Sequence, residues 1–102
     1  MPGSGAPTSR DEFSYLPTYV SPRTATEKKL AEIWQDALDV DRIGVTDSYE
    51  DLGGSSLVAA AIFAEIEKVF AVKVEMIMLI EAATVEELAL KIDEISAQQR
   101  GS

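Results

Sequence analysis

Residues 24–39 have the sequence TATEKKLAEIWQDALD, the clearest helical pattern in this 102-residue chain. Thr24 and Glu27 have the spacing of a capping box, in which the hydroxyl accepts from the third backbone N–H and the carboxylate reaches back. The apolar residues that follow recur at helical spacing and form one stripe: Leu30, Ile33, Trp34, Ala37 and Leu38. The pattern predicts an amphipathic helix from about Ala25 to Asp39.

Two later segments have the same periodicity. A second helix is predicted from Ser56 to about Phe70, and its broad apolar face should meet the core through Val58, Ala59, Ile62, Phe63, Ile66, Val69 and Phe70. A last helix is predicted from Val85 to about Ala97, with a second capping box formed by Thr84 and Glu87. Its core stripe consists of Val85, Leu88, Ala89, Ile92 and Ile95.

The segments between these helices are a long loop and a short apolar block. The loop runs from Val40 to Ser55, and four of its apolar residues are spaced to attach it to the core: Ile43, Val45, Tyr49 and Leu52. The block from Met76 to Ala83 fits one or two helical turns or a strand, because short apolar runs are ambiguous. We therefore predict an all-α fold, a small four-helix bundle with three longer helices and a short third one.

The two ends of the chain differ in composition from this body. Residues 1–22 contain all four prolines, which predicts a flexible linker, mobile to about residue 15. Points of loose docking within it are Phe13, Tyr15, Leu16 and Tyr19. Residues 23–97 are predicted to form the folded domain, and residues 98–102 a disordered tail.

Composition excludes several classes of function. The chain has no histidine and no cysteine, which excludes Ser-His-Asp triads, Cys-His pairs, zinc fingers and disulfide frameworks. We therefore expect no metal site. The net charge is −9, and 16 acidic but only 6 basic residues lie between Thr24 and Ala97. Such a surface repels phosphates, so nucleic acids and anionic membranes are disfavoured as partners and a protein with a basic patch is favoured.

No targeting or spanning segment is expected. The N-terminal sequence MPGSG lacks the basic and apolar regions of a signal peptide. The longest apolar run, Leu57 to Ala64, has eight residues, far fewer than the ~20 that cross a bilayer. We expect a cytoplasmic protein.

The sequence LGGSSL, residues 52–57, lies where the long loop enters the second helix. One interpretation is a flexible turn followed by a serine N-cap. The other is a modification site, since a phosphoryl group on Ser56 would face the unpaired N–H groups and positive dipole of the helix start. We expect Ser55 to be the cap and Ser56 the first helical residue. The nearby carboxylates are weak bases, so Ser56 is expected to be modified rather than to act as a nucleophile.

The second helix also has an apolar outer face. Leu57, Ala60, Ala61 and Ala64 lie opposite its core face, where an ordinary amphipathic helix would carry charges. This pattern indicates a surface that other proteins contact. In the alternative interpretation, the linker or the third block covers it.

From about Tyr19 to Ala97 the chain resembles carrier proteins, most closely the peptidyl carrier (thiolation) domains of nonribosomal peptide synthetases. Four segments carry the resemblance: residues 19–24 as the entry linker, 33–45 as the first helix and loop start, 47–57 as the attachment motif, and 79–85 as the lead into the last helix. Three positions depart from the family pattern. Ser55 stands where His or Asp is usual, Glu50 where a second aromatic residue is common, and Ala83 where proline is common.

The resemblance implies that Ser56 receives 4′-phosphopantetheine from coenzyme A through a phosphopantetheinyl transferase. The thiol of the arm would hold aminoacyl, peptidyl or acyl groups as thioesters, and Gly53, Gly54 and Ser55 would support the site. Adenylation, condensation, thioesterase or tailoring domains would dock on Leu57, Ala60, Ala61, Ala64, Met76 and Ile77. The resemblance implies a non-catalytic carrier of antibiotic biosynthesis, and we expect a monomer as an isolated domain.

Two alternatives remain open. The chain could be the acyl carrier of a polyketide or hybrid assembly line, although the paired glycines and the Asp41–Val45 run favour the peptidyl class. It could also be an unmodified helical interaction module, in which residues 53–56 only cap a helix.

Overall fold

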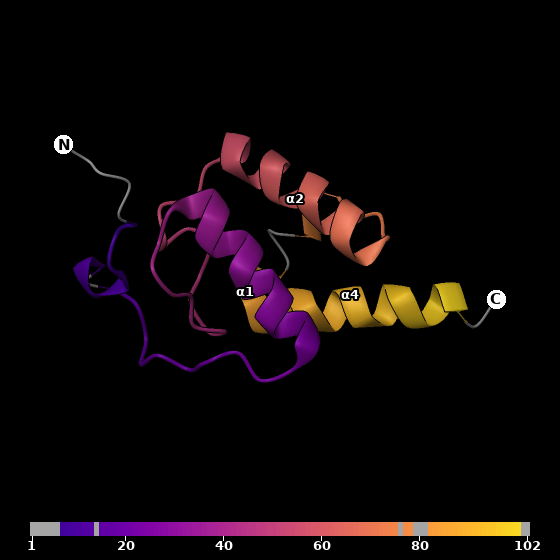
Figure 1. Ribbon diagram of the computed structural model, residues 1–102, viewed down its shortest axis with the longest axis horizontal. Helices are drawn as coiled ribbons and strands as arrows, with labels where there is room; N and C mark the ends of the chain where they lie inside the picture. Colours follow the sequence, from indigo (N-terminus) through magenta and orange to yellow (C-terminus); the bar gives the residue numbers. More distant parts are fainter. Residues whose placement is uncertain (1–6, 14, 76, 79–81, 101–102) are drawn as a thin grey trace.

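A computed structural model describes residues 7–13, 15–75, 77–78 and 82–100 of the chain. It contains three α-helices, α1 (Ala25–Leu38), α2 (Ser56–Phe70) and α4 (Val85–Arg100), preceded by the 3₁₀ turn η1 (Arg10–Glu12) (Figure 1). The described residues form no β-strand, only two isolated bridges. The all-α prediction is confirmed. Of the predicted short third helix, Ile77 and Met78 are helical, while residues 76 and 79–81 lie outside the described residues.

Side chains fix where the helices begin. The capping box of α1 is complete, since Thr24 Oγ1 accepts from Glu27 N–H at 3.0 Å and Glu27 Oε1 accepts from Thr24 N–H at 3.2 Å. At α4 only half of the predicted box forms. Thr84 Oγ1 accepts from Glu87 N–H, but the Glu87 carboxylate accepts from the Thr84 hydroxyl instead of its backbone. The Thr84 backbone forms an isolated β-bridge with Ser48 instead.

Helix α4 is longer than predicted. Residues 98–100 continue it to Arg100, so the expected disordered tail is wrong for these three positions. Glutamine and arginine are good helix formers, and no helix-breaking residue occurs before Gly101. No helix in the described part of the chain is long and apolar enough to cross a membrane.

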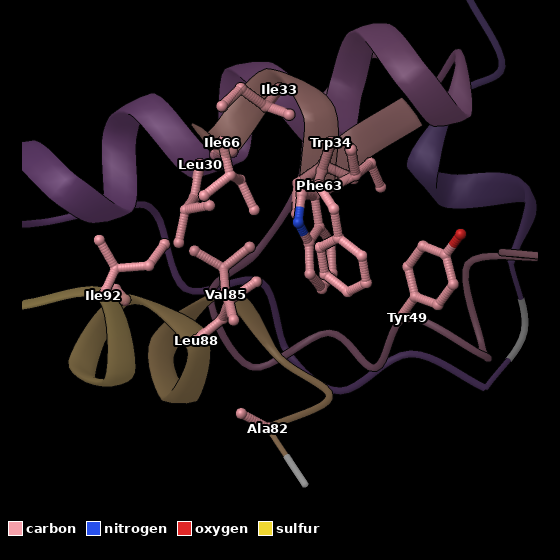
Figure 2. Close-up of a cluster of buried hydrophobic side chains, with 14 of the residues drawn as sticks. Leu30, Ile33, Trp34, Tyr49, Phe63, Ile66, Ala82, Val85, Leu88 and Ile92 are labelled. Atoms are coloured by element: carbon pink, nitrogen blue, oxygen red, sulfur yellow. The ribbon is translucent and has the colours of Figure 1, made fainter. Parts of the chain in front are cut away.

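The core lies where α1 packs against both α2 and α4 (Figures 1 and 2). Trp34 is fully buried and makes an edge-to-face contact with Tyr49, with ring centroids 5.5 Å apart. The predicted loop anchors are all buried: Ile43, Val45, Tyr49 and Leu52. The prediction for Val69 is wrong, because its side chain is 41% exposed. Val69 lies at the margin of the apolar face of α2, where it lines an open groove beside α1.

The N-terminal strap, which we define as residues 7–20, is attached to this body. Thr8 N–H donates to Asp39 O at 2.8 Å, and Asp41 N–H donates to Thr8 O at 2.8 Å. Phe13 and Leu16 are partly buried against the core, as expected for docking points, but Tyr15 is 86% exposed and docks on nothing. The strap lies at the same end of the molecule as the start of α2 (Figure 1).

A buried ion pair holds the strap in place. The Arg10 guanidinium donates to both carboxylate oxygens of Asp47, each at 2.6 Å, and Asp47 is fully buried. This hydrogen bonding to Asp47 raises the pKa of Arg10 above its ordinary value. Arg10 also lies over the Tyr19 ring, 5.1 Å from its centroid. Within the segment predicted as a linker, this contact forms because a buried carboxylate needs a cation beside it.

Candidate functional site

The candidate site is the turn that leads from the long loop into α2. Tyr49 attaches this turn to the body, since its N–H donates to Ala83 O at 2.8 Å and its ring packs on Trp34. Figure 2 shows the Tyr49 ring beside Phe63, with its hydroxyl pointing away from the buried cluster. That hydroxyl donates to Ser55 O at 2.6 Å. Tyr49 therefore connects the turn to the hydrophobic core.

The two glycines of the turn serve different purposes. Gly53 has φ +82°, a left-handed conformation that strongly favours glycine, and a Cβ added there would meet no atom within 4 Å. A Cβ added to Gly54 would instead overlap the Tyr49 ring. The turn therefore has open space at Gly53, whereas Gly54 lies against an aromatic face.

Ser55 and Ser56 occupy the positions predicted for them. Ser55 is the N-cap of α2, its Oγ accepting from Val58 N–H at 3.3 Å, and Ser56 is the first helical residue. The Ser56 side chain is exposed, and no residue in the described part of the chain forms a hydrogen bond with its hydroxyl. The hydroxyl therefore faces solvent beside the backbone N–H groups of the first turn, which lack helical partners.

Among the described residues, no side chain forms a hydrogen bond that could activate the Ser56 hydroxyl. Asp47, one of the three carboxylates considered from sequence, is fully buried and bound to Arg10 and to Gly44 N–H. Glu50 and Asp51 are exposed to solvent, and neither carboxylate forms a hydrogen bond with Ser56. The arrangement fits an acceptor for a phosphate-linked group better than a nucleophile, because the hydroxyl is accessible and the helix start favours an anion.

The outer face of α2 is exposed to solvent. Leu57 is 83% exposed, and Ala60, Ala61 and Ala64 are also exposed. The described part of the strap packs elsewhere, on the loop that contains Asp41 and Asp47. Ile77 is 56% exposed, whereas Met76 lies outside the described residues. Met78 is partly buried against the core.

Two contacts, one that holds the strap and one that holds the turn, were not predicted from the sequence. One is the Arg10–Asp47 pair, whose members are separated by 37 residues. The other is the hydrogen bond between the Tyr49 hydroxyl and Ser55 O, whose local signal was only an aromatic residue six positions before a serine. Neither pairing leaves a periodic pattern, so neither could have been found without the three-dimensional arrangement.

Comparisons with known proteins agree with this geometry. The family model described as phosphopantetheine attachment site matches residues 28–92. Gramicidin S synthase 2 of Brevibacillus brevis is 40% identical over 81 residues, which are 79% of this chain but 2% of that synthase. This chain therefore spans about one-fiftieth of the length of that relative.

Two solved structures of carrier proteins are similar in fold. An active-site mutant of a peptidyl carrier protein superposes with a TM-score of 0.75 at 35% identity, covering 78% of this chain and 89% of that one. The second is a peptidyl carrier protein structure determined with the phosphopantetheine transferase Sfp and coenzyme A. It gives a TM-score of 0.73 at 36% identity, covering 74% of this chain and 99% of the matched one.

Proposed function

This chain belongs to the phosphopantetheine attachment-site family, and we propose that Ser56 is the residue that carries the arm. It is a carrier domain of the peptidyl class, since its relatives are nonribosomal peptide synthetases. The exposed Ser56 hydroxyl at the first position of α2 is the observation that carries the proposal. Gly53, Gly54 and Ser55 support the site by forming the turn and the cap.

The chemistry at Ser56 is a phosphoryl transfer. A transferase moves the phosphopantetheinyl group of coenzyme A to Ser56 Oγ, forming a serine–phosphate bond as the pyrophosphate bond of coenzyme A breaks and adenosine 3′,5′-bisphosphate leaves. The serine proton leaves to a base of the transferase, since the described part of this chain offers none beside the hydroxyl. When attached, the group supplies a thiol that holds an aminoacyl or peptidyl chain as a thioester.

Delivery requires weak and interchangeable docking. Leu57, Ala60, Ala61, Ala64 and Ile77 are exposed, and a small apolar face suits transient contacts better than permanent ones. Met76, which lies outside the described residues, is included in the proposed surface on the basis of the sequence. Adenylation, condensation, thioesterase or tailoring domains with a basic rim around an apolar centre would complement the acidic body. The domain itself is proposed to be non-catalytic.

The test is an intact mass spectrum after incubation with coenzyme A, Mg²⁺ and a broad-specificity phosphopantetheinyl transferase. The wild type should gain one phosphopantetheinyl group and Ser56→Ala none. Ser55→Ala is the matched control, because it removes the neighbouring hydroxyl and should still be modified. Modification of Ser56→Ala, or of neither protein while another carrier is loaded in parallel, would refute the assignment and favour an unmodified interaction module.

A further inference from the structure

The carbonyl oxygen of Ser55 accepts two hydrogen bonds. One comes from Ala59 N–H at 2.9 Å, which is the ordinary first bond of α2. The other comes from the Tyr49 hydroxyl at 2.6 Å, from a side chain outside the helix. Because the Ser55 carbonyl and the Ser56 N–H belong to one planar peptide unit, donors on this oxygen restrict the backbone on which Ser56 is mounted.

Tyr49 holds both ends of this short segment. Its carbonyl accepts from Gly54 N–H at 3.1 Å, while its hydroxyl reaches Ser55 O. The ring itself cannot move far, since Trp34 packs on it edge to face and the Gly54 backbone lies against it. Burial raises the pKa of the Tyr49 hydroxyl, which keeps its proton available for donation.

Earlier in the turn, backbone bonds run from Leu52 N–H to Ser48 O at 3.1 Å and from Gly53 N–H to Glu50 O at 3.0 Å, but the side-chain restraints next to Ser56 are weak. Gly53 and Gly54 contribute no side-chain packing of their own, and the Ser55 cap is a long 3.3 Å bond at an exposed position. The Tyr49 hydroxyl is therefore the short, core-anchored contact that fixes the turn at the residue before Ser56.

We propose that Tyr49 is a positioning residue for the modification of Ser56, its hydroxyl holding the Ser55–Ser56 peptide in the orientation that presents the serine to the transferase. This inference rests on the proposed function of Ser56. Tyr49 is 6% exposed, so it lies beneath the surface that the transferase touches and acts only through the turn.

The expected kinetic signature is specific. Tyr49→Phe keeps the ring packing against Trp34 and Gly54 and removes only the hydroxyl. Since Leu57 and the rest of the outer α2 face are unchanged, KM for the carrier should stay the same. The kcat of the transferase should fall about 5- to 10-fold, the effect of one lost hydrogen bond that acts in the transition state.

The experiment measures transfer from coenzyme A to the full chain at varied carrier concentrations, for the wild type and Tyr49→Phe. Two controls are matched. Tyr15→Phe makes the same change at an exposed tyrosine. Ile92→Val removes one buried methylene of the core and so destabilises the fold slightly without touching the turn. Both should leave kcat unchanged.

A second measurement is independent of the transfer reaction. Amide hydrogen exchange of the unmodified protein should be faster in Tyr49→Phe than in the wild type at Ala59, whose N–H donates to Ser55 O, while amides of α4 are unchanged. Equal kcat for Tyr49→Phe and the wild type, or an equal loss in Ile92→Val, would overturn the inference. Failure of the wild type to be modified would instead refute the proposed function.

Discussion

The buried ion pair between Arg10 and Asp47 should stabilise the loop that contains Asp47. Arg10→Ala would leave the fully buried Asp47 carboxylate with the Gly44 backbone N–H as its one remaining hydrogen-bond donor among the described residues. Breaking a buried pair in this way costs about 3–5 kcal/mol. We expect a loss of about that size in urea unfolding.

The matched control for Arg10→Ala is Arg42→Ala. Arg42 pairs with Asp11 at 3.3 Å, and both side chains are at least 46% exposed, so its loss should cost less than about 1 kcal/mol. Equal midpoints for the two variants would contradict the prediction that the buried pair stabilises the protein more than the exposed pair does.

Glu27 makes stability depend on pH at the acidic end. Hydrogen bonds from the Arg23 side chain, and then from the N–H groups of Arg23 and Thr24, lower its pKa from 4.5 to about 2. A lowered folded-state pKa means that the stabilisation is complete above pH 4.5 and is lost as the pH falls toward 2.

The size of this effect is limited by solvent. Arg23 is 52% exposed, so screening reduces the full linkage value of ~3 kcal/mol to about 1–2 kcal/mol. Urea unfolding at pH 6 and pH 3 should show this loss in the wild type and a smaller one in Glu27→Gln. An equal pH dependence in both proteins would contradict the prediction.

Features set by neighbouring residues could be predicted from the sequence, whereas contacts between distant residues could not. Thr24, Ser55 and Ser56 were placed correctly because a cap depends on neighbours three residues away. Arg10 looked like an isolated charge in a proline-rich segment. Its partner is buried by the folding of a distant loop, an event that no local pattern records.

At the level of single elements, one face of α2 packs in the core and the opposite face is the proposed docking surface. Ile62 and Ile66 are fully buried on one side, and Leu57 is 83% exposed on the other. Leu57→Glu should therefore weaken partner docking, with KM for the transferase rising about 10-fold or more, and leave helicity and melting temperature nearly unchanged.

The control for Leu57→Glu is Leu90→Glu. Leu90 is 61% exposed on α4, so it makes the same apolar-to-acidic change away from the proposed surface. A large drop in the melting temperature of Leu57→Glu by circular dichroism would place Leu57 in the packing of the fold and contradict the docking surface.

Helix bounds followed from periodicity to within a residue or so for α1 and α2. The exceptions have physical causes. Val69 lies at the margin of a stripe, where an angle on a helical wheel does not tell whether a neighbouring helix is near enough to cover it. The end of α4 was set too early because its last residues are polar, and polar residues extend an exposed helix without marking a core.

On the scale of the whole molecule, the bundle follows from burial. Three amphipathic helices of 14, 15 and 16 residues can cover their apolar stripes only against one another. The sequence therefore predicted the all-α architecture, but it placed the start of the folded unit at residue 23. We propose that the folded unit begins by Thr8, where the strap first bonds to the body.

The docked strap also limits how far the chain before α1 can extend. Fully extended, the sixteen residues from Thr8 to Arg23 would span roughly 50 Å, at about 3.3 Å per residue. Because Thr8 pairs with Val40, this segment instead runs back along the body from Thr24 to the far end of α1. Any segment joined before Thr8 would therefore start from the C-terminal end of α1 for as long as Arg10 stays paired with Asp47.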